Sequence, residues 1–136
     1  MAVRARRGPQ TLRKLLVIDD DLKLLSSYRE LLMPYGFQVL TAPDGEKAIS
    51  VVEENPDIML VILDVVMPTM DGREWLRWFR ERRQDSPVIV ISAYKFVDED
   101  GTLAPTAILE KPFHVAELLD LVGLFCGLST PSASVV

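Results

Sequence analysis

Four short, mostly apolar runs end at residues with acidic, hydroxyl or ammonium side chains, and this repeated pattern constrains the fold more than any other feature. The runs cover residues 15–18, 60–63, 88–91 and 107–110, and they lead into Asp19 and Asp20, Asp64, Ser92 and Lys111 respectively. Helical patterns separate the runs, and such alternation predicts parallel strands joined by right-handed crossovers. The carboxyl ends of the strands would then share one edge of the sheet, where open α/β sheets bind their ligands.

Turn and capping residues place the remaining elements. Aspartate or Asp-Gly pairs precede the first three helical patterns, and proline, glycine or asparagine follows them, as is typical of helix boundaries. The last helix begins after Pro112 and ends near Gly127. These signals predict helices over about 22–35, 44–54, 71–83 and 114–125, with a further short strand over 37–41.

The stretch between Ser92 and Lys111 breaks this rhythm. A helix is due there, but Gly101 and Pro105 both interrupt the segment. We expect a short or irregular fourth helix.

The bulk properties indicate one globular domain with loose ends. The 136 residues carry a net charge of −5, but the first 14 residues hold five basic side chains and no acid. We expect a basic flexible arm over 1–13, a folded domain over 14–128 and a flexible tail or linker stub over 129–136. An acidic domain is a poor nucleic-acid binder, so we expect no nucleic-acid contact through it. No apolar stretch could span a bilayer, and the lone Cys126 permits no internal disulfide, which fits the cytoplasm.

The residues at the strand ends suit a phosphate and a metal. Three carboxylates packed together repel one another, so Asp19, Asp20 and Asp64 would call for a divalent cation. Ser92 and Lys111 are suited to bind phosphoryl oxygens. Each residue alone has an ordinary explanation as a helix cap, a turn residue or a surface charge, so the prediction rests on their joint placement.

Four segments together resemble the receiver domain of the bacterial response regulators, of the chemotaxis-regulator-like kind. They are Val-Ile-Asp-Asp-Asp at 17–21, Leu-Asp-Val-Val-Met-Pro-Thr-Met-Asp-Gly at 63–72, Ile-Ser-Ala at 91–93 and Lys-Pro-Phe at 111–113. The resemblance covers about residues 15–128. It implies a flavodoxin-like, doubly wound sheet of five parallel strands in the order 2-1-3-4-5, with helices on both faces.

The resemblance also implies a role for each site residue. Asp64 would be the phosphorylated nucleophile. Asp20, Asp64 and the backbone carbonyl of Val66 would bind Mg²⁺ directly, with Asp19 acting through a metal-bound water. Ser92 would move to bind the phosphoryl group, and Lys111 would pair first with Asp64 and then with the phosphate. The Lys111-Pro112 peptide bond would be cis, as prolyl bonds in tight turns can be.

One departure concerns how such a domain would signal. The family's aromatic switch residue, three positions before the lysine, is replaced by Ile108. Because Ile108 has no ring to swing, we expect activation to order or shift the segment over 94–105.

The leading functional prediction is a phosphorylation-controlled signalling domain. A sensor histidine kinase or phosphotransfer protein would donate the phosphoryl group, an unknown downstream protein would receive the signal, and a homodimer stays open. The domain would catalyse its own phosphorylation and dephosphorylation without being a turnover enzyme. The alternatives are a phosphorylation-independent interaction module and a phosphatase of the haloacid dehalogenase type. The phosphatase would need an aspartate where Val66 stands.

Overall fold

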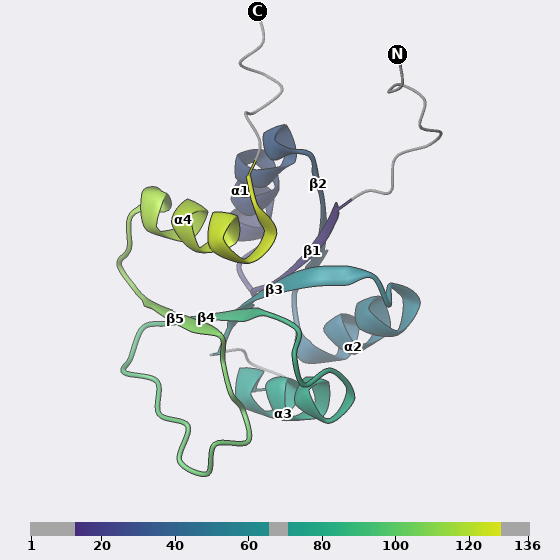
Figure 1. The fold of residues 1–136 in the computed structure, drawn as a ribbon, viewed down its shortest axis with the longest axis vertical. Helices are drawn as coiled ribbons and strands as arrows, with labels where there is room; N and C mark the ends of the chain where they lie inside the picture. The colour runs from purple at the N-terminus through teal and green to yellow at the C-terminus, as the bar shows by residue number, and fades with distance from the viewer. Residues whose placement is uncertain (1–12, 66–70, 129–136) are drawn as a thin grey trace, which may run out of the picture.

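Five parallel strands form one sheet in the computed structural model, which describes residues 13–65 and 71–128. The strands stand in the order β2-β1-β3-β4-β5, and every neighbouring pair is parallel (Figure 1). Their bounds are β1 Arg13–Ile18, β2 Phe37–Ala42, β3 Ile58–Asp64, β4 Val88–Ser92 and β5 Ala107–Glu110. The predicted flavodoxin-like order is therefore confirmed.

Aspartate caps begin the first three helices where the sequence predicts them. The side chains of Asp21, Asp44 and Asp71 each accept a hydrogen bond from a backbone N–H of the following helix. The helices of the described residues are α1 Leu22–Leu32, α2 Gly45–Glu54, α3 Gly72–Arg82 and α4 Val115–Cys126, with a short 3₁₀ helix, η2, over Met33–Tyr35.

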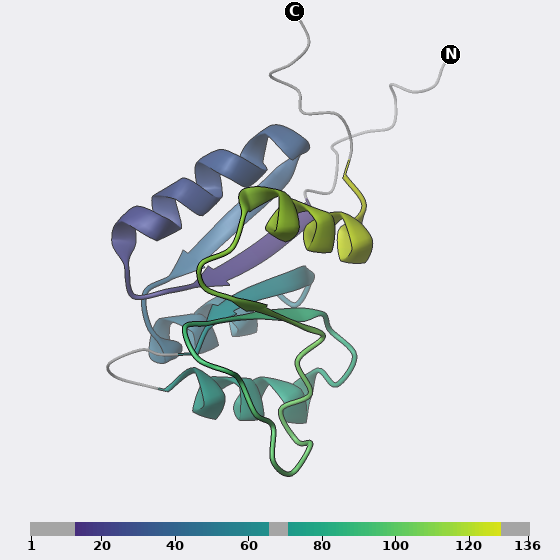
Figure 2. The same ribbon diagram turned by 90° about the vertical axis from the view of Figure 1, so that its left-hand side faces the viewer.

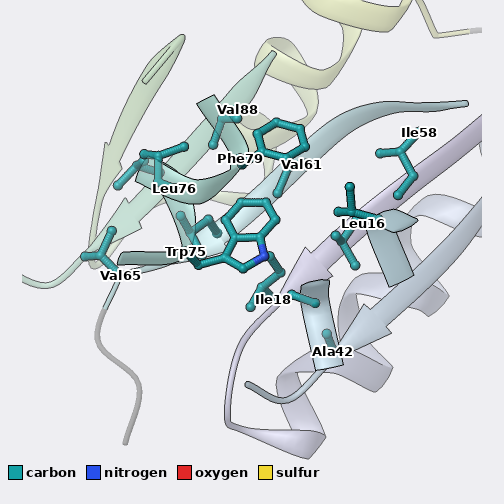
Figure 3. Close-up of a cluster of buried hydrophobic side chains, with 14 of the residues drawn as sticks. Leu16, Ile18, Ala42, Ile58, Val61, Val65, Trp75, Leu76, Phe79 and Val88 are labelled. Atoms are coloured by element: carbon teal, nitrogen blue, oxygen red, sulfur yellow. The ribbon is translucent and has the colours of Figure 1, made fainter. Parts of the chain in front are cut away.

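The helices cover the sheet in two layers (Figure 2), α1 and α4 on one face and α2 and α3 on the other. The strands are apolar on both faces because each face is covered. On the α2 and α3 face, Trp75 lies in the centre of the buried cluster and stacks on Phe79 with 4.8 Å between ring centroids (Figure 3). No helix in the described ranges is long and apolar enough to cross a membrane.

The segment 93–106, between β4 and β5, forms bends and turns and no helix. The expected short or irregular helix between β4 and β5 therefore does not form. The fourth helix of the chain, α4, instead follows β5. Phe96 and Leu103 bury their side chains in the α2 and α3 cluster, which anchors the segment to that face.

The ends of the domain are described only in part. Arg13, which we assigned to the basic arm, is the first residue of β1, and its guanidinium donates to the backbone carbonyls of Cys126 and Gly127 at the C-terminal end of α4. The rest of the predicted arm and the predicted tail lie outside the described residues.

Candidate functional site

Strand register brings four sequence-predicted residues to one edge of the sheet. Ile18 of β1 pairs with Leu63 of β3, so Asp19 and Asp64 follow side by side. Asp64 pairs with Ile91 of β4, which puts Ser92 one position further on. Ser92 in turn pairs with Glu110 of β5, directly before Lys111. The predicted meeting of the strand ends is therefore what the parallel register produces.

Three carboxylates gather at this edge. Asp19, Asp20 and Asp64 each place one carboxylate oxygen within 4.8 Å of the others, and within the described ranges they form the group that could hold a metal ion. Asp19 and Asp64 are buried, whereas Asp20 is exposed. The backbone N–H of Asp21 donates to Oδ1 of Asp19 at 2.9 Å and so orients that carboxylate. Hard oxygen ligands of this kind, with one side open to water, suit Mg²⁺.

The pKa of Asp19 reflects the excess of negative charge in this cluster. Burial, with a smaller contribution from the negative charges of Asp64 and Asp20, raises the pKa of Asp19 to about 6. The hydrogen bond from Asp21 and the charge of Lys111 act in the opposite direction but do not restore the ordinary value. A buried carboxylate with a raised pKa gains stability from a nearby cation, so the site favours binding of a positive ion.

Lys111 supplies one positive charge next to the Asp64 carboxylate. Its Nζ lies 3.1 Å from Oδ2 of Asp64, and 35% of the lysine side chain is exposed against 9% of the aspartate. The Lys111-Pro112 peptide bond is cis, as predicted. The ammonium lies beside Asp64, as the family resemblance implied, and it is partly open to solvent.

The Ser92 hydroxyl is occupied by the backbone of the following turn. Its Oγ donates to the carbonyl of Tyr94 at 2.6 Å and accepts from the N–H of the same residue at 3.1 Å. Ser92 is buried, and its backbone carbonyl accepts from the N–H of Lys111 at 2.8 Å. The hydroxyl is thus at the site but committed to Tyr94.

Close backbone packing connects the end of β3 to helix α3. The N–H of Gly72 donates to the carbonyl of Val65 at 3.0 Å. A Cβ on Gly72 would lie 2.5 Å from the Cα of Val65 and 2.8 Å from the carbonyl oxygen of Asp64, so only glycine fits. Val66, whose carbonyl is a predicted metal ligand, lies outside the described residues.

Tyr28 of α1 also belongs to the surroundings of the site. Its pKa is raised by burial and by the charges of Asp19 and Asp64. It lines a cavity of about 520 Å³ with Leu24, Lys111, Pro112 and Phe113. Its place at a core position of α1 is the same for a purely structural tyrosine, so the sequence carries no signal for this proximity.

Comparison with known proteins gives one consistent family. Residues 15–123 match the family described as response regulator receiver domain. Transcriptional regulatory protein CpxR of Klebsiella pneumoniae is 42% identical over 112 residues, which are 79% of this chain and 47% of that protein. Transcriptional regulatory protein PrrA of Mycobacterium tuberculosis is 38% identical over 110 residues, 78% of this chain and 46% of that protein. The chain therefore spans about half the length of these relatives.

Solved structures show the same fold. The response regulator TrrA of Thermotoga maritima, in complex with Mg²⁺-BeF, has a TM-score of 0.74 and 29% identity, covering 84% of this chain and 99% of that one. CheY of Borrelia burgdorferi, in its complex with CheX, BeF₃ and Mg²⁺, has a TM-score of 0.73 and 28% identity, covering 83% and 89%.

Proposed function

This chain belongs to the response regulator receiver domain family, and on that premise we propose that it receives a phosphoryl group on Asp64. The donor would be a phosphohistidine of a sensor histidine kinase or of a phosphotransfer protein. A carboxylate oxygen of Asp64 would form a bond to phosphorus while the phosphorus–nitrogen bond of the donor breaks. The imidazole would leave with a proton from solvent.

The observation that carries this proposal is the pairing of Asp64 with Lys111 inside the carboxylate cluster. An anionic nucleophile attacks an anionic phosphoryl group only when positive charge offsets their repulsion. The ammonium 3.1 Å from Oδ2 of Asp64 provides part of that charge. The raised pKa of Asp19 indicates that the cluster still has negative charge to be offset.

The donor set fits Mg²⁺. Asp20 and Asp64 would hold the ion directly, Asp19 through a water, and the carbonyl of Val66 completes the proposed ligand set. When bound, the ion would supply positive charge to the acceptor and to the phosphoryl oxygens. The relatives TrrA and CheY bind Mg²⁺ together with a beryllium fluoride group, which supports the same chemistry here.

Ser92 and Lys111 would hold the transferred group. The Ser92 hydroxyl carries one proton that can be donated to a phosphoryl oxygen, and the Lys111 ammonium carries three. Lys111 is already beside Asp64, whereas Ser92 must first leave the carbonyl of Tyr94. Phosphorylation would therefore require Ser92 to break an existing hydrogen bond, whereas Lys111 would only extend its contact from Asp64 to the phosphoryl group.

The downstream partner belongs to the same proposal. CpxR and PrrA are transcriptional regulators about twice as long as the part they share with this chain. We propose that the domain passes its state to a downstream protein or to a further segment of a longer chain, in the cytoplasm. A homodimer remains one of the arrangements through which it could do so.

Mass spectrometry after incubation with acetyl phosphate and Mg²⁺ tests the proposal. The wild type should gain one phosphoryl group, and Asp64→Asn should gain none. Asp120→Asn, at an exposed position of α4, is the matched control and should be labelled like the wild type. Undiminished labelling of Asp64→Asn would overturn the assignment. Absence of labelling in the wild type would favour the phosphorylation-independent interaction module.

A further inference from the structure

Two arginines of α3 fasten the helix-free segment 93–106 along the length of that helix. Figures 1 and 2 both show the segment running beside α3, on the side of the sheet where Phe96 and Leu103 are buried. Arg73, in the first turn of α3, contacts the part of the segment near Ser92. Arg80, in the last turn, contacts the part that leads to β5. The segment is therefore attached to α3 at two separate points.

The attachment through Arg73 connects the two strand ends that carry Asp64 and Ser92. Arg73 donates from Nη1 to the carbonyl of Val97 at 2.8 Å, and its guanidinium lies 4.2 Å from the ring centroid of Phe96. Arg73 directly follows Gly72, whose backbone packs on Val65 and Asp64 without room for a Cβ. A displacement at the end of β3 or of β4 would therefore displace the Arg73 side chain.

The attachment through Arg80 is stronger and more deeply buried. Its side chain donates to the carbonyls of Leu103 and Ala104, and also to those of Arg83 and Ser86 at the end of α3 and the approach to β4. Arg80 is 7% exposed, so these bonds form away from water, where an unpaired carbonyl is costly. Asp98 adds to the rigidity of this part, since its carboxylate accepts from the N–H groups of Leu103 and Ala104.

The Ser92 hydroxyl holds the near end of the segment. A hydroxyl has one proton, which Ser92 donates to the carbonyl of Tyr94. If that proton is donated to a phosphoryl oxygen, the carbonyl of Tyr94 loses its hydrogen-bond donor. Tyr94 is exposed, so its freed carbonyl can turn to water, but Phe96 two residues later is buried and in contact with Arg73.

From these contacts, and resting on the proposed function, we propose that α3 and the segment 93–106 form a phosphorylation-driven latch. The Ser92 hydroxyl leaves the Tyr94 carbonyl for the phosphoryl group, the segment shifts at 94–97, and Arg73 passes that shift to α3. Arg80 keeps the other end of the segment in place. The signal then emerges on the α3 side of the sheet, without an aromatic residue at the position of Ile108.

The contacts of the segment 93–106 indicate that activation displaces it, and that it does not undergo a disorder-to-order transition. Its contacts with Arg73, Arg80 and the buried cluster are already formed while Ser92 is bound to Tyr94. Interfaces with two packed arrangements turn small displacements at one site into larger ones elsewhere. The expected change is therefore a displacement near Tyr94 that decreases toward Leu103.

NMR of the backbone amides, with and without Mg²⁺ and beryllofluoride as the phosphoryl mimic, tests the latch. In the wild type the mimic should shift the amides of Ser92 and Lys111, those of 94–97 and those of the first two turns of α3. The amides of Leu103 and Ala104 should shift least. Arg73→Gln should keep the changes at Ser92 and Lys111 but lose those of α3. Arg73→Lys, which keeps the positive charge and can still donate a hydrogen bond, should restore part of the changes in α3.

Arg77→Gln is the matched control for Arg73→Gln. It removes the same charge from an exposed position of the same helix. Among the described residues Arg77 makes no hydrogen bond to the segment, and its charge acts on the exposed Asp100, away from residues 94–97. It should respond to the mimic like the wild type. A response of α3 in Arg73→Gln equal to that of the wild type would overturn the latch and leave the proposed function intact. A wild type whose Ser92 and Lys111 amides ignore the mimic would overturn both.

Discussion

The ammonium of Lys111 lies 3.1 Å from the carboxylate of Asp64, and this pair joins the end of β5 to the end of β3 across the intervening strand β4. The two residues are 47 positions apart in the sequence. Because both ends belong to strands with fixed register, the pair holds the Asp64 carboxylate against a rigid frame. The lysine side chain is 35% exposed, so under the proposed function it is free to reorient toward a phosphoryl group on Asp64.

Replacing Lys111 by glutamine should slow phosphorylation of Asp64. The neutral amide cannot offset the charge of the attacking carboxylate, and loss of one charge-stabilising donor typically lowers a rate by roughly a hundredfold or more. The measurement is the rate of labelling by acetyl phosphate with Mg²⁺, followed by mass spectrometry. Lys95→Gln, at an exposed position of the segment after β4, is the control and should be labelled at the rate of the wild type. Equal rates for both variants would contradict a role for Lys111.

Replacing Asp19 by asparagine should stabilise the metal-free protein at neutral pH. The pKa of Asp19 is raised from 3.8 to about 6, so the folded state holds its proton to higher pH than the unfolded state. At a pH below both pKa values Asp19 is protonated in both states, so its burial does not lower the free energy of unfolding. As the pH rises from the unfolded pKa to the folded pKa, the charged form destabilises the folded state increasingly. Above the folded value this destabilisation is fully present, at about 3 kcal/mol.

Urea unfolding in EDTA at several pH values measures this effect. The free energy of unfolding of Asp19→Asn should exceed that of the wild type at pH 7, and the difference should shrink as the pH falls toward 4. Added Mg²⁺ should stabilise the wild type more than the variant, because a ligand stabilises the state that binds it. A difference that stays constant with pH would show that the charge of Asp19 is not its cause.

Replacing Gly72 by alanine should both destabilise the fold and impair the site. The added Cβ would lie 2.5 Å from the Cα of Val65 and 2.8 Å from the carbonyl oxygen of Asp64, and neither backbone atom can move without displacing the end of β3. Overpacking of this kind costs about 1–3 kcal/mol or more. Gly123→Ala in α4 is the control, because its Cβ would meet only the Leu128 side chain, at 3.5 Å. Denaturant unfolding should place the two variants on opposite sides of the wild type, since alanine favours a helix interior.

Replacing Arg80 by alanine should destabilise the domain strongly. Four backbone carbonyls, including those of Leu103 and Ala104, lose a charged donor in a buried setting, at a cost of about 3 kcal/mol or more in the free energy of unfolding. Arg82→Ala is the control, because that exposed side chain donates to a carbonyl of its own helix, at Trp78. Its effect should be about 0.5 kcal/mol or less. Similar denaturation midpoints for the two variants would contradict the anchoring role of Arg80.

Local patterns predicted the strands, the capped helices and the strand-end residues Asp19, Asp64, Ser92 and Lys111. This was possible because the information is periodic and local. An apolar run covered on both faces shows as a strand, and an aspartate before a helical pattern shows as its cap. Once the strands are parallel and in this order, their carboxyl ends meet without any further instruction from the sequence.

Local patterns thus determined the parallel strands and the identity of the residues at their carboxyl ends, and the resemblance to the receiver family supplied the strand order. The tertiary structure alone decided that the Ser92 hydroxyl is bound to Tyr94, and that Arg73 and Arg80 hold the segment 93–106 against α3. Arg80 stands next to Phe79 on the buried side of its helix. A charged residue at such a position is the sequence signal for a buried polar contact, but it does not identify the partner. The partners of Arg80 in the segment 93–106 are backbone carbonyls more than 20 positions away. Every residue carries such a carbonyl, so only the folded chain can show which of them an arginine will find.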